Sequence, residues 1–172
     1  MKIEDFKHIT FQLVRGTPLI SPPKFTPLIA DPTVLLPNQT PDEKWHLFAH
    51  SVFGVQQFIS ENGIDWQKKK VVIRAAMRPF VYKENETCYF FYEKYNGVRT
   101  MFSFLPGVKW YSEIEMITSR DLIHWTKPKS LIQPALDFHQ DKLLGKAVSN
   151  PCLIKIGNKY RLYYSSSLVK IP

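Results

Sequence analysis

Short apolar runs alternate with polar turns along the chain, and their order repeats. Each unit opens with a residue followed by proline and a short apolar run, at Asp31-Pro32, Arg78-Pro79 and Asn150-Pro151. A polar turn and a second run rich in aromatic residues follow, over 45–51, 89–94 and 161–166. Proline is tolerated at the first residue of a strand, where its missing N–H disturbs the ladder least. The pattern therefore predicts repeated units of short antiparallel strands.

A serine followed six residues later by tryptophan occurs twice, as Ser60 to Trp66 and Ser119 to Trp125. In the first copy, Asn62-Gly63 predicts a two-residue hairpin turn, because both central positions of a type I′ turn need positive φ. Asp121-Leu122 is the weaker counterpart in the second copy. Each copy follows an apolar run that reads as a third strand. We expect both tryptophans to pack between neighbouring units.

The units recur at 47 and then 72 residues, from Pro32 to Pro79 and from Pro79 to Pro151. A repeat of about 40 to 50 residues with several short strands is the signature of a β-propeller. The sequence predicts an all-β fold of four-stranded antiparallel blades, with about two and a half blades present. We attribute the longer second interval to an insert around 98–110. The predicted regions are an extended arm over 1–29 and a partial propeller over 30–172, with blades at 31–66, 78–125 and 150–172.

Composition agrees with this fold class. Aromatic residues make up 14% of the chain and there are 13 prolines, which favours strands and opposes long helices. No apolar run approaches the ~18 residues of a membrane span, and the N-terminus lacks a signal-peptide core. We therefore expect no membrane partner and a cytoplasmic location. Cys88 and Cys152 fall in predicted strands and are expected to be buried free thiols.

The net charge of +8 raises the question of nucleic-acid binding. The densest basic run, Lys68 to Lys70, directly follows Trp66 and is interpreted as part of a solvated link between blades. The sequence contains no zinc-ligand spacing, glycine-rich clamp or recognition-helix pattern. We expect no nucleic-acid partner, no metal and no cofactor.

The Asp-Pro opening, the aromatic second strands and the Ser-x-Asp-x-x-x-Trp turn together resemble the furanosidase-type five-bladed propellers. These are glycoside hydrolase families 43, 32, 62 and 68, with family 130 as relatives. The chain is most similar to uncharacterised family 43-like proteins, through Asn150-Pro151-Cys152-Leu153 and residues 160–165. The resemblance covers 30–172, the first half of such an enzyme. It implies a carbohydrate ligand and, if the protein is active, a glycosidase or glycoside phosphorylase.

The resemblance also implies two opposed carboxylates across the sugar. Asp31 matches the base or nucleophile of the first blade. The second blade should carry an aspartate beside Pro79, but Arg78 stands there instead. The acid glutamate of the third blade should lie two residues before Pro151, and that position is Ser149, followed by Asn150. Hydrolysis of this type then lacks its usual proton donor.

Other residues are candidates for the missing role. The aromatic runs end at equivalent positions, at His50, Glu93 and Ser165. A carboxyl beside aromatic rings has a raised pKa that suits an acid, which favours Glu93. We predict Asp31 and Glu93 as the catalytic carboxylates. The predicted ligand-binding residues are His50, Arg78, Trp110, Ser149 and Asn150, with Trp110 as a stacking platform for the sugar.

Each candidate also has an ordinary structural interpretation. Asp31 caps a turn, Glu93 pairs with Lys94 or Arg99 at the surface, and His50 is a structural histidine. Three functional interpretations stay open: a carbohydrate-active enzyme, a sugar-binding propeller without its acid, and an inactive truncated fragment. The half blade at the C-terminus suggests that a second copy completes the ring as a homodimer. Arg78 and the net charge favour an anionic ligand over a neutral one.

Overall fold

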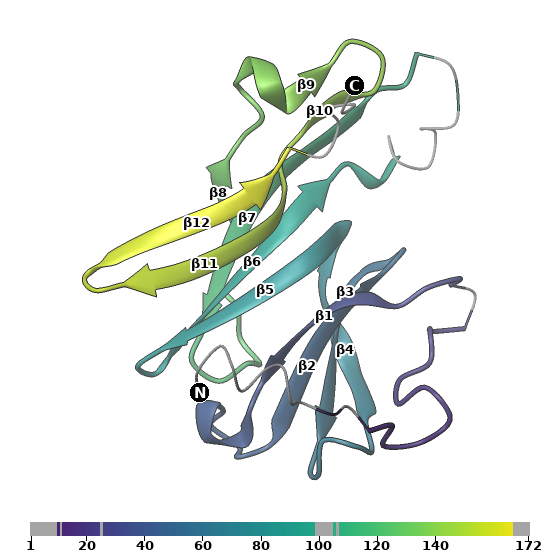
Figure 1. Cartoon of the computed structure of the whole chain (residues 1–172), viewed down its shortest axis with the longest axis vertical. Coiled ribbons are helices and arrows are strands. Elements are labelled where there is room, and N and C mark those ends of the chain that lie inside the picture. The colour runs from purple at the N-terminus through teal and green to yellow at the C-terminus, as the bar shows by residue number, and fades with distance from the viewer. Residues whose placement is uncertain (1–9, 11, 25, 99–104, 106, 167–172) are drawn as a thin grey trace.

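Three groups of strands lie side by side in the protein (Figure 1). The computed structural model describes residues 10, 12–24, 26–98, 105 and 107–166. Within these ranges the elements whose two ends are described are strands and the two 3-10 helices η2 (Pro37–Gln39) and η3 (Asp137–His139). The predicted all-β fold class is confirmed. Most of the insert near 98–110 lies outside the described residues.

The first sheet is a complete four-stranded antiparallel blade in the order β1-β2-β3-β4. Its strands are β1 (Ala30–Leu35), β2 (Trp45–Ser51), β3 (Gly54–Ser60) and β4 (Gln67–Arg74). The fourth strand occupies the segment that we expected to be a link between blades. Its lysines are largely exposed, as is common on an edge strand, where charge discourages further pairing. The blade therefore extends beyond Trp66.

The second sheet repeats this arrangement and adds to it. Its antiparallel strands are β5 (Ala76–Glu84), β6 (Thr87–Tyr95), β7 (Trp110–Ser119) and β8 (Lys129–Ile132). A short strand β10 (Gly145–Ala147) then pairs in parallel with the start of β7, and β9 (Gln140–Asp141) pairs with β10. These two strands have no counterpart in the first sheet. They contribute to the long second interval, together with the insert.

The third group is the hairpin of β11 (Ser149–Ile156) and β12 (Lys159–Ser165). Strand β11 lies against β5 and β6 of the second sheet (Figure 1). The described residues thus contain two sheets of at least four strands and one two-stranded hairpin. The first strands of all three units follow one another across the molecule, as expected for the inner strands of propeller blades.

The turn after β3 is built differently from the predicted type I′ turn. Gly63 has a positive φ of 74°, but Asn62 does not, so that prediction was wrong. The Ser60 hydroxyl instead accepts the backbone N–H groups of Asn62 and Gly63 at 3.3 and 3.0 Å. The Asn62 side chain accepts those of Ile64 and Asp65, both at 2.9 Å. Side-chain oxygens therefore replace backbone partners in this turn.

The turn after β7 has the same construction. The Ser119 hydroxyl accepts the N–H groups of Asp121 and Leu122 at 3.3 and 2.9 Å. The Asp121 carboxylate accepts those of Ile123 and His124 at 2.8 and 2.7 Å. Leu122 has a positive φ of 61°, the conformation that glycine has in the first copy. The Leu122 side chain is fully buried in the core. This burial offsets the free-energy cost of the left-handed backbone, which is roughly 1–2 kcal/mol.

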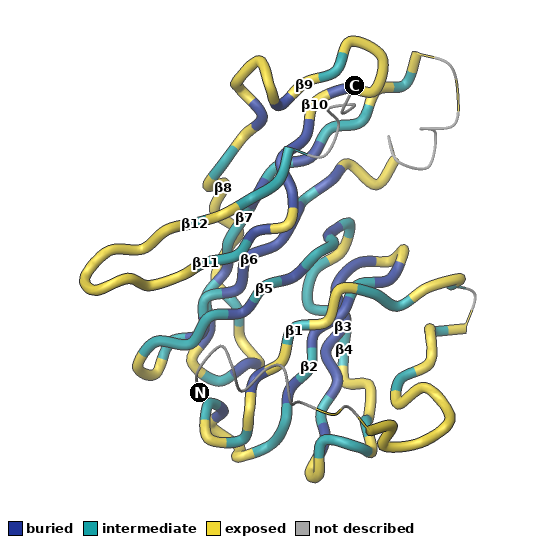
Figure 2. Tube along the Cα trace, viewed as in Figure 1, coloured by how far each residue is buried: buried dark blue, intermediate teal, exposed yellow. Residues whose placement is uncertain are grey.

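Aromatic rings join the first two blades. The Trp125 ring lies 6.3 Å from Phe48 of the first blade and 5.4 Å from Phe90 of the second, both in edge-to-face geometry. Trp125 therefore packs between blades, as predicted. Trp66 lines a cavity of about 270 Å³ with Leu19 and other residues, and the described residues of that lining all belong to the arm and the first blade. Buried residues follow the central strands of both sheets (Figure 2).

Three further features concern the cysteines, helices that could span a membrane, and clusters of possible metal ligands. Both cysteines are free, Cys88 fully buried in β6 and Cys152 only half-buried in β11. In the part of the chain that the structure describes, no helix has the length and apolar character needed to cross a membrane. Within the same part, no group of three or more His, Cys, Asp or Glu side chains is arranged to hold a metal ion.

The aromatic packing between blades predicts a large effect of truncation. Phe90 is fully buried, so Phe90→Ala is expected to lower the free energy of unfolding by about 3–5 kcal/mol. Denaturant unfolding followed by circular dichroism measures the change. The matched control is Phe53→Ala, since Phe53 is 50% exposed, and its effect is expected to stay within about 0.5 kcal/mol. Equal losses in the two variants would contradict the assignment of the core.

Completion of the ring by a second copy stays a prediction. It requires a solution mass of twice the 20.1 kDa of one chain. Light scattering on the purified protein measures that mass directly. A monodisperse species of one chain mass would contradict the homodimer.

Candidate functional site

The three inner strands begin with the same irregularity. Asp31, Arg78 and Asn150, each directly before proline, have φ values of 50°, 51° and 50°. The strand register shifts at each of these places, as it does at a β-bulge. A positive φ is uncommon outside glycine, and a residue before proline normally adopts extended backbone. Strain of this kind, repeated at three equivalent positions, marks a candidate functional site.

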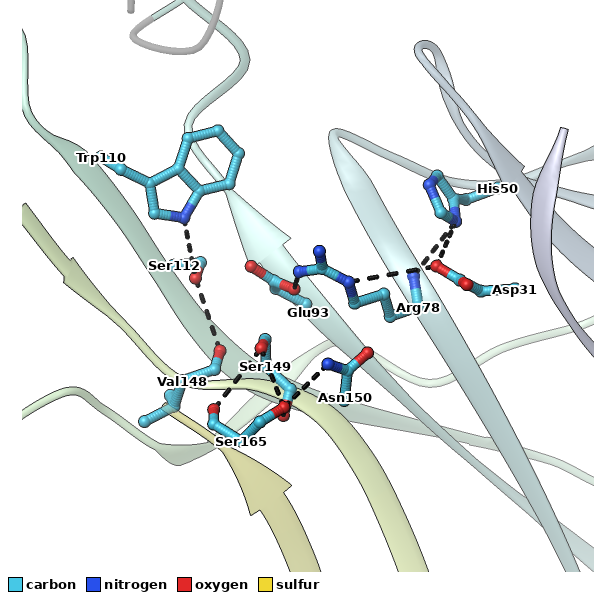
Figure 3. Close-up of polar contacts among 10 residues, drawn as sticks. All are labelled: Asp31, His50, Arg78, Glu93, Trp110, Ser112, Val148, Ser149, Asn150 and Ser165. Atoms are coloured by element: carbon cyan, nitrogen blue, oxygen red, sulfur yellow. Dashed lines mark hydrogen bonds and ion pairs between the residues drawn. The ribbon is translucent and has the colours of Figure 1, made fainter. Parts of the chain in front are cut away.

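The second strands bring three more side chains to the same place. Ala30 pairs with His50, Met77 with Glu93, and Ser149 with Ser165, so each partner stands opposite the residue that precedes the strained position. The predicted equivalence of His50, Glu93 and Ser165 is confirmed by this register. Figure 3 shows the three resulting pairs around a common centre: Asp31 and His50, Arg78 and Glu93, Asn150 and Ser165.

Arg78 connects the first two pairs. Its Nη1 donates to Oε2 of Glu93 at 2.5 Å, and its Nε lies 4.0 Å from Oδ2 of Asp31 (Figure 3). The backbone N–H of Arg78 donates to Nδ1 of His50 at 3.4 Å. That His50 Nδ1 atom also lies 3.4 Å from Oδ2 of Asp31. One guanidinium therefore bridges carboxylates from two different blades.

Glu93 is completely buried, with 0% of its side chain exposed. Its second oxygen, Oε1, has no hydrogen-bond partner among the described residues. Burial raises the pKa of Glu93, while the nearby Ser112 hydroxyl, Arg78 guanidinium and Trp110 indole act in the opposite direction. Three neighbouring groups thus favour the ionised carboxyl against the effect of burial, and Arg78 is the one cation among them.

Asp31 and His50 have different surroundings from Glu93. The Asp31 side chain is 50% exposed, so its carboxylate is open to a ligand. Burial lowers the pKa of His50; Asp31 opposes that shift and Arg78 adds to it. His50 is therefore mainly neutral at neutral pH. An exposed carboxylate and a buried one thus lie on either side of Arg78.

Trp110 and Ser112 form the wall next to Glu93. The Trp110 indole N–H donates to the Ser112 hydroxyl at 3.1 Å, and that hydroxyl donates to the Val148 carbonyl at 3.4 Å (Figure 3). The Trp110 ring stacks on Tyr95, with centroids 5.7 Å apart. The sequence interpretation missed Ser112. Its place two residues after Trp110 on one strand, and so on the same face, was the available signal.

The third pair carries no ionisable group. The Asn150 side-chain amide donates to the Ser165 hydroxyl at 2.7 Å. Ser149 is fully buried beneath them, with its hydroxyl 3.4 Å from that of Ser165. Where the family resemblance places an acid, this chain thus has neutral hydrogen-bonding groups. The seven predicted site residues all lie at this centre or in its wall (Figure 3).

The charges at the centre do not match an anionic ligand. Asp31 and Glu93 both face Arg78, and His50 is mainly neutral, so the one guanidinium already has two carboxyl partners. The guanidinium that suggested an anionic sugar is already occupied by a carboxylate. A neutral ligand fits this arrangement better.

Comparison with known proteins supports the fold. The chain is similar to a solved thermostable family-43 glycoside hydrolase, with a TM-score of 0.51 and 17% identity. The match covers 79% of this chain and 41% of that chain, so this chain spans about two fifths of the length of the hydrolase. No protein-family model and no curated protein matches the sequence. The likeness shows the fold, that of part of a β-propeller.

The burial of Glu93 predicts a specific pH dependence of stability. A carboxyl whose pKa is raised on folding contributes stability that is present below its unfolded value of about 4.5 and is lost as pH rises through the folded value. The free energy of unfolding of the wild type is therefore expected to fall relative to that of Glu93→Gln between pH 4.5 and neutrality.

Denaturant unfolding at several pH values measures this difference. The matched control is Glu86→Gln, a change at an exposed position in the turn between β5 and β6. Its difference from the wild type is expected to stay constant across the same pH range. Parallel curves for the wild type and Glu93→Gln would contradict the raised pKa.

Proposed function

We propose that the centre around Arg78 binds a neutral carbohydrate and hydrolyses a glycosidic bond. The observation that carries the proposal is the pair of carboxylates, one exposed and one buried, on either side of a single guanidinium. Both contacts are made by one guanidinium, so Oδ2 of Asp31 and Oε2 of Glu93 lie at most about 9 Å apart. This separation is compatible with the roughly 5 to 9.5 Å between the carboxyl groups of glycosidases.

The two carboxyl groups have opposite environments, which suits opposite roles. Asp31 is exposed and acts as the base or nucleophile. Glu93 is buried, and its raised pKa suits a proton donor. In hydrolysis, Glu93 gives its proton to the leaving glycosidic oxygen. Water supplies the hydroxyl that bonds to the anomeric carbon and returns one proton to the pair of carboxylates.

The remaining residues orient the sugar. His50, Arg78 and Asn150 present hydrogen-bonding groups at the centre, with Ser149 beneath them. Trp110 has one face on Tyr95, which holds the ring as a platform for a sugar. The solved protein that is similar in fold is a glycoside hydrolase, which supports a carbohydrate ligand for this chain. Hydrolysis is favoured over phosphorolysis because the centre has no unpaired cation for phosphate among its described residues.

Sugar binding without turnover is the second candidate. The observation that favours it is the complete burial of Glu93, together with the neutral Ser149 at the position expected for the acid. A truncated, inactive chain is a third outcome of the same experiment. In that case neither turnover nor binding is expected.

The deciding experiment measures turnover and binding together. Arabinosides, fructosides and mannosides are the substrates, and the corresponding free sugars are the ligands. Asp31→Asn is expected to lower turnover by roughly 10²–10⁴-fold while sugar binding is retained, because the amide cannot act as a base or nucleophile. Asp65→Asn, in the turn after β3, is the control and should leave turnover unchanged.

Each result has a distinct meaning. Turnover that is insensitive to Asp31→Asn would overturn the catalytic assignment. Binding without turnover in the wild type would favour the second candidate. Neither binding nor turnover of any of these sugars by the folded wild type would overturn the proposed function.

A further inference from the structure

Glu93 cannot touch a ligand in the structure as it stands. Its side chain is 0% exposed, whereas that of Arg78 is 32% exposed. The Arg78 guanidinium holds Oε2 of Glu93 at 2.5 Å and lies between Glu93 and the exposed carboxylate of Asp31 (Figure 3). A proton donor has to come within hydrogen-bond reach of the atom that it protonates. Something has to move before Glu93 can act, and Arg78 is the group that lies between it and the exposed Asp31.

We propose that Arg78 is a latch: a sugar that engages the guanidinium draws it away from Glu93 toward Asp31, and Glu93 then becomes the proton donor. This inference rests on the proposed function, because it assigns the step that prepares the same centre for chemistry. Arg78 is a positioning residue in this scheme. The acid is produced only when a ligand occupies the centre.

Arg78 has a second partner within reach. Its Nε already lies 4.0 Å from Oδ2 of Asp31, while its Nη1 bonds Glu93. The guanidinium thus has a buried carboxylate on one side and an exposed one on the other, which makes two discrete arrangements of one side chain possible. Hydroxyl groups of a sugar beside Asp31 offer further acceptors on the exposed side. The strained backbone at Arg78 fixes where its side chain starts, between the two carboxylates.

Loss of the latch changes the charge that Glu93 can carry. Burial raises the pKa of Glu93, and Arg78 is one of the groups that oppose the shift. Oε1 has no hydrogen-bond partner among the described residues, so without Arg78 a carboxylate here would be compensated only by the neutral Ser112 and Trp110. When the guanidinium leaves, the buried carboxylate is expected to take a proton from solvent. That proton is the one that passes to the leaving oxygen.

No other described group at the centre replaces the lost positive charge. From β7, Ser112 and Trp110 face Glu93 as neutral groups, and Tyr95 of β6 has a pKa raised by burial and by Glu93 itself. The first blade contributes Asp31 and the mainly neutral His50, and the third contributes only amide and hydroxyl groups. Among these described side chains, Arg78 is the one full positive charge that favours the ionised form of Glu93, beside the neutral Ser112 and Trp110.

The first test follows protons during binding. Calorimetry of arabinose, fructose and mannose binding at neutral pH, in buffers of different ionisation enthalpy, gives the protons taken up per sugar. The wild type is expected to take up as much as one proton for each sugar bound. Glu93→Gln and Arg78→Met should take up none, because the first cannot titrate and the second is already protonated. Binding by the wild type without proton uptake would overturn the latch and leave the proposed function standing.

The second test needs no sugar. Carboxyl ¹³C NMR of glutamate-labelled protein follows the titration of Glu93, identified by the signal that Glu93→Gln removes. In Arg78→Met, the proton affinity of Glu93 is expected to rise at least tenfold, about one pKa unit. Arg78→Lys keeps the charge but not the planar fork and should give a smaller rise. If Arg78→Met fails to fold, the titration of Glu93 in Arg78→Lys alone tests the latch.

The two tests separate the latch from the function beneath it. An unchanged titration of Glu93 in both Arg78 variants would overturn the latch whatever sugars bind. Absence of binding by all three sugars, with the expected rise in the NMR titration, would overturn the proposed carbohydrate function while the coupling of Arg78 to Glu93 stands.

Discussion

The strained residue before each proline is the constraint on which the rest of the centre depends. At Asp31, Arg78 and Asn150 the chain has a positive φ and the register shifts. Such a backbone costs about 1–3 kcal/mol at each place and persists only where the surroundings determine it. The pairing of each first strand with the second strand of its unit fixes this backbone conformation. The aromatic contacts of Trp125 with Phe48 and Phe90 hold two of the blades together.

The pairing of Arg78 with Glu93 follows from this frame and is poorly explained by stability. Desolvation of a buried ion pair costs about as much as its attraction returns, so apolar groups of similar volume are often equally stable there. Oε1 of Glu93 adds an unsatisfied polar atom to that cost. A functional role for the pair, such as the proposed latch, explains its presence better than stability does. The neutral Asn150 and Ser165 pair shows that the same position on another blade needs no charge.

Local sequence patterns predicted the repeat, whereas strand and side-chain pairings between distant segments could not be predicted from them. Proline and the aromatic runs lie close together in sequence, so the equivalence of His50, Glu93 and Ser165 was predictable. The lysine-rich edge strand β4 resembled a link because five of its eight residues are polar or charged. The parallel pairing of β10 with β7 joins distant segments and leaves no periodic signal. The pairing of Glu93 with Arg78 rather than Lys94 required the alternation of side chains on β6, since adjacent residues point to opposite faces.

The two candidate catalytic groups occupy different positions in their units, and this gives them different environments. Asp31 stands at the strained position of the first blade, at the rim of the centre, where solvent stabilises its charge. Glu93 stands on the second strand of the next blade, one layer deeper, where burial opposes its charge. Two carboxyl groups at equivalent positions would share one environment and titrate alike. Burial raises the pKa of Glu93, whereas Asp31 is exposed to solvent, and unlike environments of this kind suit one group to act as acid and the other as base.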